Sequence, residues 1–104
     1  MKRVTGRAAR RLRALGHSLK PTVTVGRDGV TAAVVATAEA NLSAHELIKV
    51  KVGPGCPLDR QAVAAELAGR TGAAVAQLLG RTILLYRAGE EPRIQLPPCR
   101  APEK

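Results

Sequence analysis

Aromatic side chains are almost missing from this sequence of 104 residues, which contains one tyrosine, Tyr86, and neither tryptophan nor phenylalanine. Modules such as the RRM and the OB-fold bind nucleic acids by stacking bases on several exposed rings. The composition excludes recognition of that kind. If the chain binds a nucleic acid, it must do so mainly through charge and backbone contacts.

Acidic residues are also scarce. Eight Asp and Glu stand against seventeen Lys and Arg, which gives a formal net charge of +9. The imbalance is concentrated near the N-terminus, because residues 1–29 hold eight of the basic residues and a single acid, Asp28. A local cationic field of this kind attracts phosphate polymers or anionic membranes, and it carries no information about the fold.

Long apolar runs are also absent. No segment approaches the roughly 18 apolar residues of a membrane-spanning helix, and the N-terminus lacks the apolar stretch of a signal peptide. We therefore expect a cytoplasmic protein with no membrane partner. Transit peptides are Arg-rich and acid-poor as well, but the regular pattern of residues 7–20 favours a structured segment.

Clusters that could carry chemistry are missing too. The two cysteines, Cys56 and Cys99, lie in proline-flanked segments and belong to no C-x-x-C or Cys/His ligand set. Apart from Glu90-Glu91 in the tail, the acidic residues are scattered singly, and the sequence shows no Ser/His/Asp or Cys/His arrangement and no Walker motif. We expect no enzymatic activity, no metal, no cofactor and no small-molecule substrate.

Hydrophobic periodicity predicts an amphipathic first helix. Ala8, Leu12, Leu15 and Leu19 recur at helical spacing, and Lys20-Pro21 ends the pattern. The remaining sides of this helix are basic and carry Arg7, Arg10, Arg11 and Arg13.

Six further elements follow. They are a strand at 22–25, a helix capped by Thr31 that loosens from Asn41 to His45, a strand at 47–52, a helix from Asp59 to Gly72, and two strands at 74–79 and 82–87 joined by Gly80-Arg81. In the strand at 47–52, Ile48, Val50 and Val52 lie on one face and Lys49 and Lys51 on the other.

This order, α-β-α-β-α-β-β, predicts an α/β (α+β) domain with a four-stranded mixed sheet. Strands linked through helices should run parallel, and right-handed crossovers place the second and third helices on one face. The first helix is then available to cover the other face. We predict a single domain over residues 1–88 and a C-terminal tail over residues 89–104, and we expect a monomer.

One loop stands out, the glycine-bracketed run Gly26-Arg27-Asp28-Gly29 between a strand and a helix. Glycines permit positive φ and keep side chains away from backbone N–H groups, and the following helix offers free N–H groups and the positive end of its dipole. Together with the surrounding basic charge, the loop indicates recognition of an RNA backbone.

Four blocks of the chain resemble a known family. Residues 13–21 (RALGHSLKP), 25–29 (VGRDG), 45–51 (HELIKVK) and 79–87 (LGRTILLYR) are similar, in this order, to the CRM domain (chloroplast RNA splicing and ribosome maturation) in its stand-alone bacterial, YhbY-like form. The resemblance spans about residues 7–88, and residues 94–97 of the tail are also similar to family members.

The resemblance implies a KH-like fold related to the C-terminal domain of translation initiation factor 3. It also implies RNA binding through a GxxG loop and the neighbouring basic surface, and association with precursors of the large ribosomal subunit. The family's GxxG falls on Gly26 and Gly29, and its basic loop residue on Arg27. Asp28 is a departure, because this position is often neutral in the family and an acid here should weaken attraction for phosphate.

The candidate RNA-binding residues are therefore in the loop, the first helix and its end, and the second strand: Gly26, Arg27, Asp28, Gly29, Lys20, Arg7, Arg10, Arg11, Arg13, Lys49 and Lys51. Purely structural explanations of these residues also stay open. The arginines could be the solvated side of a helix, and outward lysines on a strand commonly protect a sheet surface. A small basic α/β protein could also coat DNA without sequence preference, as Alba-like nucleoid proteins do.

Overall fold

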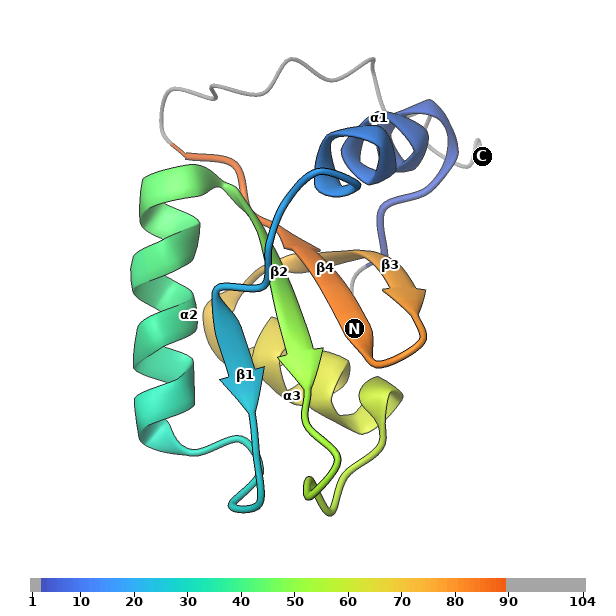
Figure 1. Cartoon of the computed structure of the whole chain (residues 1–104). Coiled ribbons are helices and arrows are strands. Elements are labelled where there is room, and N and C mark those ends of the chain that lie inside the picture. The colour runs from blue at the N-terminus through green and yellow to red at the C-terminus, as the bar shows by residue number, and fades with distance from the viewer. Residues whose placement is uncertain (1–2, 90–104) are drawn as a thin grey trace.

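The computed structural model describes residues 3–89, which form a four-stranded sheet with helices on both faces (Figure 1). The elements are α1 (Gly6–Gly16), β1 (Val23–Val25), α2 (Ala32–His45), β2 (Leu47–Val52), α3 (Arg60–Thr71), β3 (Ala74–Leu79) and β4 (Thr82–Tyr86). The predicted element order and mixed α+β class are confirmed. Cys99 and the similarity at 94–97 lie outside the described residues.

The strands follow the order β1-β2-β4-β3 across the sheet. β1 and β2 pair in parallel, whereas β4 is antiparallel to both of its neighbours, β2 and β3. The first three strands therefore run in one direction, as their helical connections predict, and the hairpin inserts β4 between β2 and β3.

The main core lies between the sheet and the pair α2 and α3. It is built from alternating strand residues such as Ile48 and Ile83 and from helix residues such as Leu42 and Leu67, all at most 1% exposed. Each such side chain contributes roughly 1.5–3 kcal/mol when it is fully buried. The expected sidedness of β2 is confirmed, because Ile48, Val50 and Val52 all belong to this core.

The opposite face of the sheet is covered in part by α1. Leu12 is fully buried there against Leu47, Ala76 and Leu84, and the half-buried Tyr86 packs against the same cluster. Burial, and secondarily the carboxylate of Glu46, raises the pKa of Tyr86 above its usual value. The only aromatic ring of the sequence is therefore packed beside α1 as a neutral phenol.

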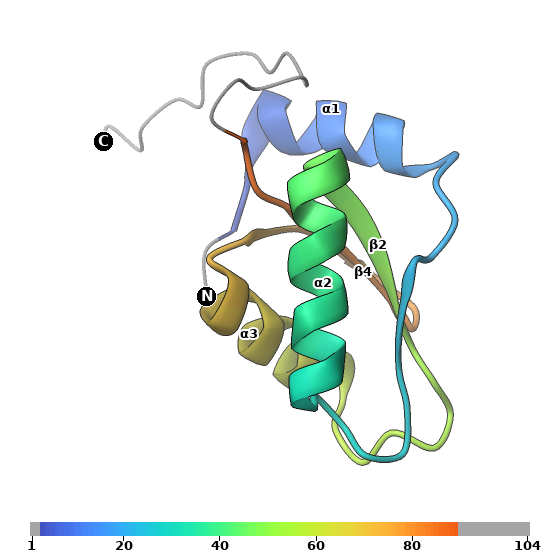
Figure 2. The same ribbon diagram turned by 90° about the vertical axis from the view of Figure 1, so that its left-hand side faces the viewer.

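The two views place α1 and the loop between β1 and α2 at opposite ends of the molecule (Figures 1 and 2). Because α1 covers only one end of its face, the remainder of that face is open. Lys51 and Thr24 are exposed there, on two neighbouring strands that pair at these residues.

The predicted helix signals for α2 and α3 act as caps. The Thr31 hydroxyl accepts a hydrogen bond from the backbone N–H of Val34 at 3.2 Å, and the Asp59 carboxylate accepts one from Ala62 at 2.8 Å. Gly72 ends α3 with a φ of 74°. These caps satisfy backbone groups that a helix end otherwise leaves unpaired.

The predicted extent of the first helix is wrong at its C-terminal end. α1 stops at Gly16 and does not continue to Lys20. A Cβ at Gly16 would lie 2.7 Å from a Leu84 methyl carbon, so glycine permits close contact here. Beyond Gly16, the Ser18 hydroxyl donates a hydrogen bond to the Leu15 carbonyl, and the Leu19 N–H donates one to the Gly16 carbonyl. These bonds turn the chain toward β1, and Leu19 still packs against the cluster around Leu12.

The predicted loosening of the second helix from Asn41 to His45 is also wrong, because α2 continues to His45. Asn41 donates its side-chain amide to the Thr37 carbonyl at 2.8 Å, and the buried Leu42 anchors the last turn in the core. An asparagine that bonds back to position i−4 is compatible with a helix interior. The helix ends instead at Glu46, whose φ is 66°.

Candidate nucleic-acid interface

Three of the five acids in residues 3–89, Glu39, Asp59 and Glu66, lie on the α2 and α3 side of the sheet, away from the cations of α1 and β2. Glu39 and Glu66 lie on α2 and α3, Glu46 and Asp59 are at the ends of these helices, and Asp28 lies in the loop before α2. Within residues 3–89, α1 and the open part of its sheet face contain no acid. The two faces of the sheet therefore differ in charge.

With the exception of Arg27, which is in the 26–29 loop, the cations predicted as site residues lie on the face that α1 covers. We call this set the basic face: Arg7, Arg10, Arg11 and Arg13 on α1, Lys20 after it, and Lys49 and Lys51 on β2. The ion pairs between described residues are Arg70–Glu66 and Arg87–Glu39, so no carboxylate in residues 3–89 neutralises the basic face.

Part of the basic face converges on a hollow that we call the α1 hollow. Arg10 and Arg13 of α1 and His17, the residue that follows α1, line one side, and Lys49, Thr82 and Leu79 line it from the sheet. Its volume is about 430 Å³. Leu79 is 66% exposed, which is unusual for a large apolar side chain. The hollow thus combines three basic side chains with an apolar wall.

The remaining arginines of α1 point elsewhere. Arg10 and Arg13, three residues apart, both line the α1 hollow, whereas Arg7 and Arg11, four residues apart, form the other pair. Arg7 and Arg11 are exposed, and neither lines the α1 hollow. The structure therefore divides the four predicted arginines into two pairs. Lys20 lines a neighbouring groove that also includes Lys49.

A strip of mainly polar residues extends from the α1 hollow toward the end of the molecule that carries the 26–29 loop. The cross-strand register aligns Thr24 of β1, Lys51 of β2 and Thr82 of β4 in one row, with Leu79 next to Thr82. Lys49 lies two residues from Lys51 on the same side of the strand, since side chains alternate between faces. The two lysines therefore extend the cationic surface from α1 down the sheet.

The loop over residues 26–29 forms a tight turn. The Gly29 N–H donates to the Gly26 carbonyl at 3.0 Å, and Gly29 has a φ of 73°, a conformation that glycine adopts without strain. Gly26 does not have a positive φ, and a Cβ there would meet no atom within 4 Å. The fold therefore requires glycine at position 29, whereas at position 26 the absence of a side chain mainly exposes backbone.

Arg27 and Asp28 occupy the centre of this turn and are both exposed. In the described part of the chain, Asp28 neither pairs with Arg27 nor caps α2, whose cap is Thr31. The two charges of the turn nearly cancel. Any strong attraction for phosphate must therefore also involve the basic face.

A second glycine-rich turn, over residues 53–56, lies beside the 26–29 loop, and the sequence interpretation assigned it no role. The Gly53 N–H donates to the Val25 carbonyl at 2.8 Å, and a Cβ on Gly55 would lie 3.9 Å from the Cβ of Arg27. The adjacency arises because β1 and β2 are parallel neighbours whose C-terminal ends meet at one edge of the sheet. Two glycine turns thus form one end of the molecule.

Three further cations or donors near these surfaces were not predicted as site residues: His17 directly after α1, Arg81 in the hairpin turn and Arg60 at the start of α3. Helical spacing from Arg10 and Arg13 could have indicated His17. Arg60 and Arg81 are 21 positions apart, and only the hairpin and the β2–α3 connection bring them together. Within residues 3–89, no group of His, Cys, Asp and Glu could hold a metal ion, and no helix is long and apolar enough to cross a membrane.

Comparisons with known proteins agree with this architecture. An RNA-binding protein from Haemophilus influenzae is 42% identical over 86 residues, which cover 83% of this chain and 87% of that protein. The probable RNA-binding protein YqeI from Bacillus subtilis is 37% identical over 95 residues, covering 90% and 99% of the two chains. The solution structure of the hypothetical protein SAV1595 from Staphylococcus aureus matches with a TM-score of 0.77 and 32% identity, covering 90% of this chain and 99% of that one.

The match to a family model covers nearly all of the described structure. Residues 4–87 fit the CRS1 / YhbY (CRM) domain, a span that begins before α1 and ends just after β4. It includes α1, Lys20, the 26–29 loop and β2, which carry the predicted site residues. The chain belongs to the CRS1 / YhbY (CRM) domain family.

Proposed function

We propose that the chain binds RNA through the basic face and the 26–29 loop. The observation that carries this proposal is the separation of charge by the sheet, with seven cations on one face and the paired or capping acids on the other. Such a surface attracts the phosphates of a nucleic acid and positions its backbone. One relative is named an RNA-binding protein and another a probable RNA-binding protein, which favours RNA as the ligand.

In the proposed mode, α1 and the lysines of β2 capture the RNA electrostatically, and the 26–29 loop contacts a short stretch of backbone. The bare backbone at Gly26 supports close approach of a phosphate, and Arg27 supplies a charged donor beside it. The packing of Tyr86 beside α1 supports a mode that relies on phosphates and not on aromatic stacking. The proposed role requires no catalytic step.

We further propose that the RNA is ribosomal and that the protein acts in the cytoplasm on precursors of the large subunit. Support for this finer assignment comes from the family resemblance. It predicts that the tagged protein sediments with immature large subunits in a sucrose gradient of cell extract. Recovery of the protein with nucleoid DNA alone would favour the Alba-like alternative.

The salt dependence of binding tests the electrostatic mechanism. Each phosphate contact releases counterions, so at least three contacts should give a slope of log K against log salt of about −2 or steeper for a single strand. The measurement is a fluorescence-anisotropy titration of a labelled RNA hairpin and a single strand, each between low and physiological salt, with duplex DNA as competitor. A nearly flat salt dependence would contradict the mechanism, and stronger binding to duplex DNA would favour the nucleoid alternative.

A further inference from the structure

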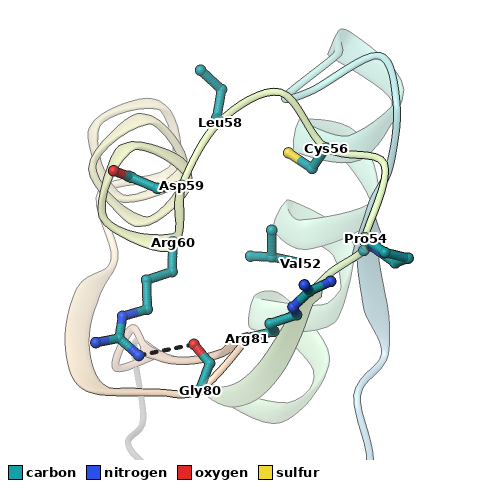
Figure 3. Close-up of a pocket in the computed structure, with 9 residues that line it drawn as sticks. Val52, Pro54, Cys56, Leu58, Asp59, Arg60, Gly80 and Arg81 are labelled. Atoms are coloured by element: carbon teal, nitrogen blue, oxygen red, sulfur yellow. Dashed lines mark hydrogen bonds between the residues drawn. The ribbon is translucent and has the colours of Figure 1, made fainter.

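A second hollow, which we call the hairpin hollow, lies outside the surface described above. It is enclosed by the 53–56 turn, the start of α3 and the turn of the β3–β4 hairpin, and its volume is about 380 Å³ (Figure 3). Small-ligand pockets typically measure roughly 300–1,000 Å³. A hollow of this size can hold one nucleotide but cannot hold a double helix.

The inner wall of the hairpin hollow is apolar. Val52 is 6% exposed, and the half-buried Cys56 and Leu58 pack against the main core. These side chains are fixed by packing, so they form a preformed surface. An apolar wall of this kind suits the face of a nucleobase, which an RNA strand exposes only where the base is unstacked.

The rim of the hairpin hollow is cationic. Arg60 donates to the Gly80 carbonyl at 2.9 Å and keeps further N–H groups for another acceptor, whereas the side chain of Arg81 extends past Val52 toward Pro54 (Figure 3). The acid on the rim, Asp59, points away from the hollow to cap α3. Within residues 3–89 neither arginine forms an ion pair with a carboxylate, and two guanidinium groups match the charge and geometry of phosphate.

The hairpin hollow and the 26–29 loop share a wall. Leu58 lines the hollow, and its Cδ1 atom would lie 3.7 Å from a Cβ placed on Gly29. Gly55, in the turn that borders the hollow, is next to Arg27. When the backbone of an RNA strand lies on the 26–29 loop, the next nucleotide of that strand can therefore reach the hairpin hollow.

We propose that the hairpin hollow receives one unstacked nucleotide of an RNA strand held on the 26–29 loop. The base lies against Val52, Cys56 and Leu58, and its flanking phosphates lie at Arg60 and Arg81. This inference rests on the proposed function and deepens it, because it requires a single-stranded or bulged segment in the RNA. A perfect duplex can bind the basic face but cannot fill the hollow.

Alkylation of the Cys56 thiol tests the inference on the unmodified protein. The probes are a single-stranded RNA 12-mer and a blunt RNA duplex that contains the same sequence, each at a concentration that saturates binding, with iodoacetamide as the reagent. Trypsin places Cys56 on peptide 52–60 and Cys99 on peptide 94–100, so mass spectrometry follows both thiols and Cys99 serves as the reference.

We expect the single strand to slow alkylation of Cys56 at least about fivefold relative to Cys99, as burial of a stacked base against the wall implies, and the duplex to leave it within about twofold. Bound single strand with unprotected Cys56 overturns the inference while leaving the proposed function intact. Equal protection by the duplex overturns it as well, since the hollow would then be covered without an unstacked nucleotide. Failure of both RNAs to bind overturns the proposed function itself.

A matched pair of variants gives a second readout. Arg81→Ala should weaken binding of the single strand about fivefold and of the duplex less than about twofold, because only the single strand places a nucleotide at the rim. Arg70→Ala removes the same charge from the other end of α3, where Arg70 pairs with Glu66, and should change neither affinity. Equal losses for Arg81→Ala on the two RNAs would contradict the assignment.

Discussion

Reversing the two arginines that line the α1 hollow, in the double variant Arg10→Glu/Arg13→Glu, should lower RNA affinity about a hundredfold, or about 2.7 kcal/mol. The change alters the local charge by four units at the point where α1 meets Lys49. It replaces two charge-assisted phosphate contacts with repulsion. Both positions are exposed, so the fold should persist, and circular dichroism and thermal unfolding check this. Affinity is measured by titration of a labelled RNA.

The chain supplies a matched control for this variant. Arg7→Glu/Arg11→Glu makes the same change of charge on the same helix, on the side that does not line the hollow. The two variants have identical net charge, so any difference between them reports position and not total charge. We expect the RNA affinity of the control to fall less than about tenfold, compared with about a hundredfold for the test variant. Equal losses would mean that α1 acts as a general cationic field, without a defined contact surface.

The second large effect is expected in the 26–29 loop. Arg27→Asp places two carboxylates side by side in the turn, while Gly29 keeps its hydrogen bond to the Gly26 carbonyl. Affinity should fall at least about tenfold, roughly 1.4 kcal/mol, through repulsion and the loss of a charged donor. The free energy of unfolding should change by no more than about 0.5 kcal/mol, because the side chain is exposed.

Asp28→Asn is the companion to this change in the same turn. Since Asp28 has no partner in residues 3–89 that would hold it away from the turn, removing its charge should raise RNA affinity about two- to threefold. Both variants are measured with the same RNA and at the same salt concentration. If Arg27→Asp folds normally and binds as tightly as the parent, the loop is a simple turn and the function must rest on the basic face alone.

Much of the fold could be predicted because local signals and the overall pattern agree. The alternation in β2 separates Lys49 and Lys51 from Ile48 and Val50, and the caps at Thr31 and Asp59 mark helix starts that the structure retains. The errors occurred where side-chain contacts override local preference. Asn41 bonds back to the helix, and Gly16 lets α1 end in close contact with Leu84.

The candidate site was only partly predictable, for a geometric reason. Sequence spacing places Arg10 and Arg13 on one side of a helix, but it cannot show which side meets the sheet beside Lys49. The hairpin hollow was missed entirely, because Arg60 and Arg81 come from separate segments that meet only after the strands pair. Surfaces made by tertiary contacts between distant segments leave no local signature in a single sequence.

The central claim is that RNA lies on the face of the sheet that α1 covers in part. Backbone amide chemical shifts of the labelled protein, followed during titration with a single-stranded RNA, test it most directly. We expect the largest changes in residues 7–17, 24–29, 49–51 and 79–82, and small changes at the exposed positions 36, 37 and 40 of α2 and 65 and 69 of α3. Changes concentrated on the outer surfaces of α2 and α3, with residues 7–17 and 49–51 unaffected, would contradict the claim.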